Sequence, residues 1–210
     1  MEEQDVKLSA VEVRVLSTLI EKSKVTPEYY PMTINALTAA CNQKTSRNPV
    51  TAYTEQEVTQ AIGVLKGKSL VATAVGGTSR SVKYKHNFGT VYDLSDAAIV
   101  IICLLMLRGP QTAGELNTNS GRMYEFRDLS EVLQVLDKLT AAEQAFVEEL
   151  PRLPGQKENR FRHTFGEISP VMDVPSVQEP LASATISIEE RLQALEEEVA
   201  MLRNLLKDLL

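Results

Sequence analysis

The sequence lacks the residue clusters on which most catalytic and metal sites depend. It contains only two cysteines and two histidines in 210 residues. Neither Cys41 nor Cys103 has a second cysteine at metal-binding spacing. His86 and His163 have no cysteine or carboxylate neighbour that would complete a site, and no GxGxxG or P-loop pattern is present. We therefore predict a protein that is not an enzyme and that holds no metal ion and no cofactor.

Long apolar runs are missing as well. The longest, residues 97–107, is shorter than the roughly 20 residues that a membrane-spanning helix needs. Residues 1–5 are acidic, whereas a signal peptide begins with basic residues. We expect a cytoplasmic protein with no membrane partner, in which both cysteines are buried thiols.

An overall excess of positive charge is also absent, because the net charge is −6. Such a balance disfavours tight nonspecific binding of nucleic acid by the whole chain. The charge is uneven, however. Residues 1–92 carry 11 basic and 8 acidic residues, a net charge of +3, whereas residues 93–167 carry 8 and 12, and residues 168–210 carry 3 and 8. A local basic surface is therefore expected in the first part of the chain.

What the sequence does contain is one unit that occurs twice. The aromatic-basic pattern of residues 84–88 (YKHNF) returns in residues 161–165 (FRHTF). Three further landmarks recur in the same order: Leu8-Ser9 and Leu94-Ser95; residues 33–37 (TINAL) and 112–116 (TAGEL); and the helical stripes Val58, Ala61, Ile62, Leu65 and Val132, Val135, Leu136, Leu139. The copies are roughly 75–85 residues apart, longer than solenoid periods. We predict two small domains, the first repeat (residues 1–92) and the second repeat (residues 93–167).

Each repeat is predicted to contain three helices followed by two strands. Ser9, Thr54 and Thr112 each have Glu three residues later, which is the capping-box pattern of a helix start. The expected helices cover residues 8–22, 33–41 and 54–67, then 96–108, a short helix from 112, and 128–142; the expected strands cover residues 71–75, 81–88, 146–150 and 159–165. Helix 96–108 is apolar almost all round, so we expect it to be buried between domains or subunits.

This order of elements predicts a fold that is mainly α with small β-hairpins (α+β), namely two tandem winged-helix domains. A winged helix is a helix-turn-helix variant in which a β-hairpin, the wing, follows the recognition helix. The connection between the second and third helices is longer than the tightest helix-turn-helix turn, which weakens the case for docking on DNA in that manner.

The end of the chain has a different composition. Residues 168–185 hold three prolines and little periodicity, which predicts a linker. Residues 186–210 carry a heptad pattern that predicts a C-terminal coiled-coil helix and a homodimer. The seam residues proposed for dimerisation are Leu192, Leu195, Val199, Leu202 and Leu206. A trimer and a helix folded back on its own domain remain alternatives.

Candidate binding residues lie in the first repeat. The polar loop, residues 42–49, contains Lys44 and Arg47, and its Asn, Gln, Thr and Ser side chains can donate hydrogen bonds to phosphate oxygens. The first wing contributes three more cations, and the third helix contributes two amides that can contact bases: Arg80, Lys83, Lys85, Gln56 and Gln60. The alternatives are a solvated loop and ordinary charged strand positions.

Several of these segments resemble a known family. Residues Leu8-Ser9, Glu12 and Leu16, the stretch of residues 42–50 (NQKTSRNPV) and the two wings are similar to the YceH family of uncharacterised bacterial proteins. The resemblance covers about residues 6–166. It implies a tandem winged-helix fold in a bacterial cytoplasm and no established activity.

Function is therefore expected to be non-enzymatic. We expect a nucleic-acid-associated or regulatory protein, with DNA as the partner of the first repeat. The alternative is a protein–protein interaction scaffold that uses the acidic second repeat and the coiled coil.

Overall fold

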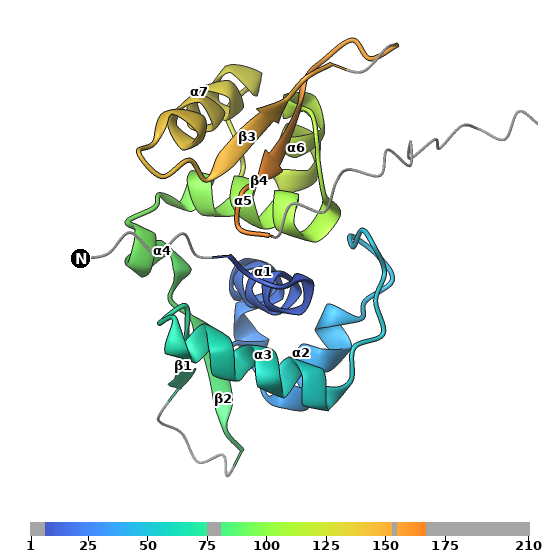
Figure 1. Ribbon diagram of the computed structural model, residues 1–210, viewed down its shortest axis with the longest axis vertical. Helices are drawn as coiled ribbons and strands as arrows, with labels where there is room; N and C mark the ends of the chain where they lie inside the picture. The colour runs from blue at the N-terminus through green and yellow to red at the C-terminus, as the bar shows by residue number, and fades with distance from the viewer. Residues whose placement is uncertain (1–6, 75–80, 153–154, 167–210) are drawn as a thin grey trace, which may run out of the picture. The chain divides into compact units, whose positions relative to one another are not determined.

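The computed structural model describes residues 7–74, 81–152 and 155–166, all of which belong to one compact unit. Over these residues the protein is mainly helical and has two small antiparallel sheets of two strands each (Figure 1). The predicted linker and the predicted coiled coil lie outside the described residues.

The elements follow the predicted order. The first repeat contains α1 (Ala10–Val25), the 3₁₀ helix η1 (Pro27–Tyr29), α2 (Ile34–Cys41), α3 (Glu55–Gly67), β1 (Val71–Ala74) and β2 (Lys83–His86). A short helix that the sequence did not predict, α4 (Phe88–Tyr92), leads into the second repeat. This repeat contains α5 (Asp96–Arg108), α6 (Ala113–Ser120), α7 (Leu129–Ala141), β3 (Val147–Leu150) and β4 (Arg160–His163).

The helices begin where capping residues predict. Ser9, Thr54 and Thr112 each form a complete capping box, in which the side chain accepts from the third helical residue and the Glu at that position returns a hydrogen bond. Such contacts satisfy N–H groups that the first turn of a helix leaves without partners. The starts of α1, α3 and α6 are therefore fixed by local sequence.

Each hairpin is extended by a short backbone pairing with the segment before the second helix of its repeat. Met32 and Tyr84 exchange two backbone hydrogen bonds of 3.1 and 2.8 Å. Gln111 and Phe161 exchange two bonds of 3.1 and 2.8 Å at the same place in the second repeat. The two repeats thus share their pairing pattern as well as their order of elements.

Helix α5 lies at the centre of the core, as its all-round apolar sequence predicted. Every residue from Ala97 to Leu107 is buried. The helix packs against α1 on the side of the first repeat and against α6, α7 and β4 of its own repeat, so no face is left for solvent. The two predicted domains therefore share one continuous hydrophobic core.

Contacts between equivalent positions relate the two repeats to each other. Ser17 and Cys103 each lie eight residues after the capping serine of their helix, and the Cys103 thiol donates to the Ser17 carbonyl over 3.2 Å. Phe88 and Phe165 end the two aromatic-basic patterns, and their ring centroids are 5.3 Å apart. A residue meets its own equivalent only near a two-fold axis.

The start of the chain also contacts the end of the second repeat, because the Leu8 amide donates to the Phe165 carbonyl over 2.7 Å. We conclude that an approximate two-fold axis passes between α1 and α5, with the two hairpins pointing away from this contact (Figure 1).

Candidate nucleic-acid interface

Arg47 of the polar loop is buried rather than exposed, with 6% of its surface accessible. Its guanidinium donates to Glu21 of α1 over 3.1 and 2.6 Å and to the Ala40 carbonyl over 3.1 Å. Burial alone would raise the pKa of Glu21, but the hydrogen bonds and charge of Arg47 and the charge of Lys22 together hold it below its ordinary value. The expectation that Arg47 contacts phosphate is corrected, because a buried cation needs this carboxylate to offset its lost hydration.

Other polar groups of the loop also point inward. The Arg14 guanidinium of α1 donates to the Cys41 carbonyl over 3.1 Å and to the Pro49 carbonyl over 2.7 Å. The Asn42 amide group donates to the Tyr53 carbonyl over 2.7 Å and accepts from the Tyr53 amide over 2.8 Å. Residues expected to contact phosphate thus hold the loop in one conformation.

The polar loop also reaches the second repeat. The Asn48 amide donates to the Leu107 carbonyl near the end of α5 over 2.8 Å. Arg108 donates to the Ser46 hydroxyl over 2.9 Å. The loop therefore provides hydrogen-bond partners for groups at the carboxyl end of α5. The sequence did not predict this role, because the partners are about 60 residues apart.

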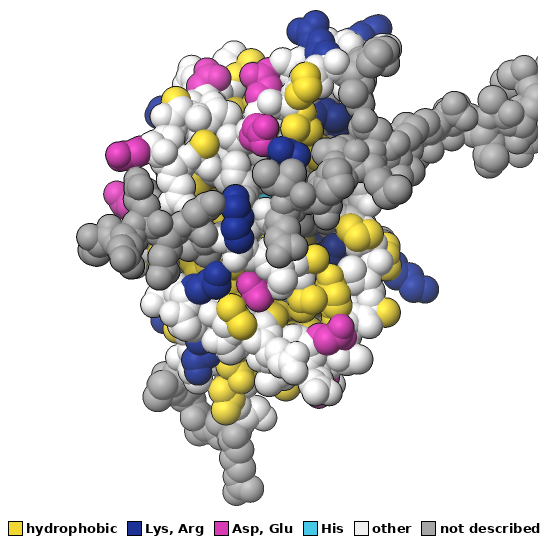
Figure 2. All heavy atoms as spheres, in the orientation of Figure 1, with side chains coloured by type: hydrophobic (Ala, Val, Ile, Leu, Met, Phe, Trp, Pro, Cys, Tyr) yellow, Lys and Arg dark blue, Asp and Glu magenta, His cyan; other side chains and the backbone are white. Residues whose placement is uncertain are grey.

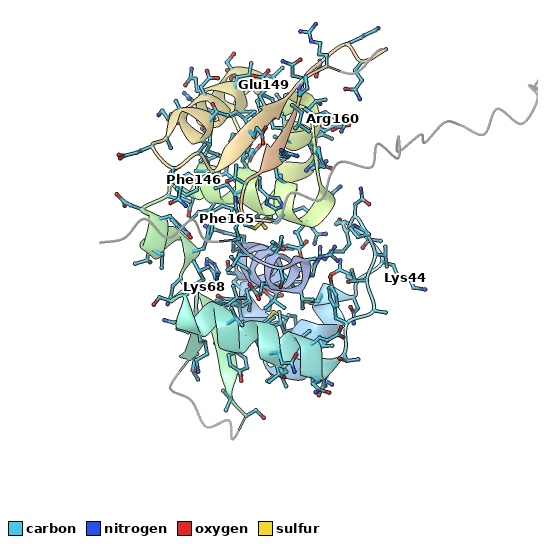
Figure 3. The ribbon with its side chains drawn as sticks, viewed as in Figure 1. Lys44, Lys68, Phe146, Glu149, Arg160 and Phe165 are labelled. Carbon is cyan, nitrogen blue, oxygen red and sulfur yellow. The ribbon has the colours of Figure 1, made fainter. Side chains whose placement is uncertain are left out.

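Lys44 is the one cation of the polar loop that faces solvent. It is exposed, and the stick view shows it projecting from the loop away from the helices (Figure 3). Within the described ranges it has no ion pair. Since the loop leads to α3, Lys44 lies on the side of that helix's N-terminus.

The exposed face of α3 carries both predicted amides. Gln56 and Gln60 are one turn apart and solvent-exposed, on the opposite side from the buried stripe that begins at Val58. The first turn, however, also holds two carboxylates. Glu55 accepts from the Asn35 side chain over 2.9 Å, and hydrogen bonds from Thr54 lower the pKa of Glu57. Negative charge at this end of the helix opposes close approach of a phosphate.

The hairpin of the first repeat carries lysines that face alanines across the strand pair. Lys83 and Lys85 lie opposite Ala74 and Ala72 in the strand register. Neither lysine forms an ion pair with any residue for which the structure gives a position. Arg80, the third predicted cation of this hairpin, lies outside the described residues. Because α3 has 13 residues and is about 20 Å long, the hairpin and Lys44 flank the helix at its two ends.

Two arginines of the second hairpin form ion pairs. Arg160, labelled in Figure 3, donates to Glu115 over 2.9 and 2.8 Å. Arg162 donates to Glu148 over 2.9 and 2.7 Å. On the face seen in Figure 2, most acidic side chains lie over the upper part, where α7 and the hairpin of β3 and β4 are found. The two repeats thus differ in how their hairpin cations are compensated.

The histidines of the two hairpins are packed rings. His86 and His163 lie opposite Val71 and Val147, at the same position of each register. Burial lowers the pKa of both to about 4, helped by the charge of a nearby basic residue in each case. The His86 ring also shares a hydrogen bond of 3.1 Å with the Ser23 hydroxyl. Both rings are therefore neutral at pH 7.

The described residues contain neither a metal-ligand cluster nor a membrane-spanning helix. No group of three or more His, Cys, Asp or Glu side chains in this part of the chain is placed to hold a metal ion. None of the described helices has the length and apolar character needed to cross a membrane.

Comparison with known proteins identifies the family. Residues 8–156 match the family model described as "Protein of unknown function, DUF480". A UPF0502 protein of Shewanella loihica is 44% identical over 211 residues, which cover 97% of this chain and 98% of the relative. UPF0502 proteins of Dechloromonas aromatica and Shewanella amazonensis are also 44% identical, over 98% and 97% of this chain and 97% of each relative. The chain therefore belongs to the DUF480 family, also called UPF0502, of uncharacterised bacterial proteins.

Proposed function

We propose that this protein is a non-enzymatic nucleic-acid-binding protein built from two tandem winged-helix domains, and that it binds through the first repeat. Three helices followed by a hairpin is the order of elements in a winged helix. The pairing of Met32 with Tyr84 adds a third short strand segment to the hairpin. In this assignment α3 is the recognition helix and the hairpin of β1 and β2 is the wing.

The observation that supports the proposal most directly is that the lysines around α3 have no ion pairs among the described residues. Lys44 stands near one end of the helix, and Lys83 and Lys85 stand on the hairpin after its other end, all three without an ion pair among the described residues. Between these cations the helix exposes Gln56 and Gln60. Cations without internal partners can release counterions from a phosphate backbone, and this release supplies most of nonspecific affinity.

Binding is expected to depend little on sequence. The exposed face of α3 has no arginine, the side chain that most often reads guanine. Glu55 and Glu57 occupy the first turn, the part of a recognition helix that approaches base edges most closely. Contacts to the phosphate backbone should therefore dominate.

The proposal is tested by titrating a fluorescently labelled duplex of about 20 base pairs at about 50 and 200 mM salt. Lys44→Gln with Lys85→Gln should weaken binding for every sequence and reduce the salt slope by about 1 for each lost phosphate contact. The control is Arg122→Gln, which removes an exposed cation of the second repeat and should change neither quantity. If the wild-type protein has no affinity for DNA or RNA at about 50 mM salt, where such binding is strong, the proposal fails.

A second candidate function, a protein–protein interaction scaffold, is favoured by the surface of α7. Leu129 and Leu133 lie one turn apart on this helix and are 44% and 42% exposed. The equivalent positions of α3 are Glu55 and Thr59. Exposed apolar pairs on an otherwise acidic repeat suit a protein partner better than nucleic acid. A wild-type protein without nucleic-acid affinity would make the scaffold the better-supported function.

A further inference from the structure

We infer that the second repeat is a silenced copy of the nucleic-acid-binding face of the first, so that each chain binds one nucleic acid. Two carboxylates, Glu115 and Glu148, neutralise Arg160 and Arg162 of its hairpin. This inference rests on the proposed function and adds the stoichiometry of binding and the residues that determine it.

The hairpins provide equivalent cations. Lys83 and Lys85 flank Tyr84 in the first aromatic-basic pattern, and Arg160 and Arg162 flank Phe161 in the second. The strand register agrees with this equivalence. His86 follows Lys85 and lies opposite Val71, and His163 follows Arg162 and lies opposite Val147. The two hairpins therefore present the same two basic positions.

The first difference lies directly across the hairpin. Lys85 faces Ala72, whereas the equivalent Arg162 faces Glu148. The Arg162 Nε and one terminal nitrogen both donate to a single Glu148 oxygen, over 2.9 and 2.7 Å. Opposite charges directly across a strand pair attract each other. One position, alanine in one repeat and glutamate in the other, thus decides whether the hairpin cation is compensated.

The second difference lies on the helix that precedes the recognition helix. The third residue of α2 is Ala36, and the third residue of α6 is Glu115. Arg160 forms a bidentate pair with Glu115, over 2.9 and 2.8 Å, and also donates to the Pro110 carbonyl over 2.8 Å. The same carboxylate accepts from the Thr112 amide over 2.9 Å. A bidentate pair to a carboxylate held by a capping box is fixed in orientation.

The consequence for binding is electrostatic. The salt dependence of affinity is proportional to the number of phosphates that a protein neutralises. An arginine already paired with a carboxylate adds no net positive charge with which to neutralise a phosphate. To bind, Arg160 would have to exchange one anionic partner for another. Further along the hairpin, Arg152 donates to Asn159, which itself donates to Glu149. The arginines at the two equivalent hairpin positions are therefore held by internal carboxylates, whereas Lys83 and Lys85 have no ion pair among the described residues.

The first arm of the test transfers the silencing carboxylate to the first repeat of the full-length chain. Ala72→Glu places a carboxylate opposite Lys85 and should lower affinity for the labelled duplex about tenfold at about 50 mM salt, the contribution of roughly one phosphate contact. The matched control, Ala72→Gln, has the same size without the charge and should stay within about twofold. Equal losses in both variants would overturn the inference.

The second arm opens the second repeat. Glu148→Ala frees Arg162, and Glu115→Gln weakens the pair with Arg160 while glutamine retains the capping hydrogen bond. The wild-type protein should bind one duplex per chain and the double variant two, with a steeper salt dependence. Wild-type binding with an unchanged stoichiometry of one in the double variant overturns the inference and leaves the proposed function intact. A wild-type chain that does not bind refutes the proposed function and the stoichiometry of one; a double variant that then binds supports only the silencing of the second hairpin by Glu115 and Glu148.

Discussion

At the scale of single residues, the hairpin histidines link stability to pH. Burial is the main cause that lowers the pKa of His86 and His163 to about 4, from an ordinary value of 6.5. The folded state therefore resists protonation, whereas the unfolded state takes up a proton at each ring below pH 6.5. Stability should be fully present above pH 6.5 and should be lost as pH falls toward 4, by up to about 3 kcal/mol per ring.

Urea denaturation between pH 7 and pH 4.5 measures this dependence. His86→Gln is expected to be less stable than the wild type at pH 7, because the packed ring is lost, but to show a shallower fall of unfolding free energy with acid. His163→Gln should behave in the same way. A wild-type unfolding free energy that is constant from pH 7 to pH 4.5 would contradict the assignment of neutral, buried rings.

Two cations of one loop show the limit of prediction at this scale. Lys44 and Arg47 lie three residues apart in a polar stretch, and their sequence context predicted the same exposed role for both. The structure separates them because Arg47 meets Glu21, 26 residues away on α1. Composition and spacing identify a polar loop, but the partner that buries one of its charges is set by tertiary packing.

At the scale of elements, α5 determines how well the two repeats hold together. Ile101→Ala and Leu105→Ala remove fully buried side chains from this helix and should each cost about 2–5 kcal/mol of unfolding free energy, since the rigid core around them collapses only partly. The matched control is Leu133→Ala on α7, where a leucine that is 42% exposed should cost under about 1 kcal/mol. Chemical denaturation compares the three variants. Equal, small losses at all three positions would show that α5 is not a packed centre.

Helix starts were the most predictable elements, because a cap acts through neighbours three residues away. Ser9, Thr54 and Thr112 were identified from this spacing alone, and the structure confirms all three. Helix α4 was missed because its five residues are too few to show a helical period. The second strand of each hairpin was predicted longer than it is, since alternation of side chains continues past the last paired residue.

At the scale of the whole molecule, we expect the heptad pattern of residues 186–210 to make the protein a dimer through a parallel coiled coil. These residues lie outside the described ranges, so the expectation rests on the sequence. Sedimentation of the full chain and of a version ending at Ser183 tests it. The full chain should sediment as a dimer and the truncated version as a monomer. An unchanged oligomeric state after truncation would exclude the coiled coil as the dimerisation element.

The sequence predicted two copies of one unit but not their arrangement. Landmarks such as residues 84–88 and 161–165 identify equivalent positions, and these positions agree with the observed strand registers. The two-fold relation emerges only from long-range contacts, such as those of Phe88 with Phe165 and of Ser17 with Cys103. The candidate interface could likewise be predicted only in part. Local periodicity indicates which of its positions are exposed, but it does not indicate which cations form ion pairs with distant residues.

The contact between Ser17 and Cys103 has an evolutionary consequence. In a dimer of identical chains, a residue on the axis meets its own copy, and every substitution occurs on both sides at once. Two copies joined in one gene escape that rule, so one side of the axis can hold serine and the other cysteine. The same release allows a mutation that makes one hairpin acidic without altering its twin. The two repeats of one chain can therefore specialise independently.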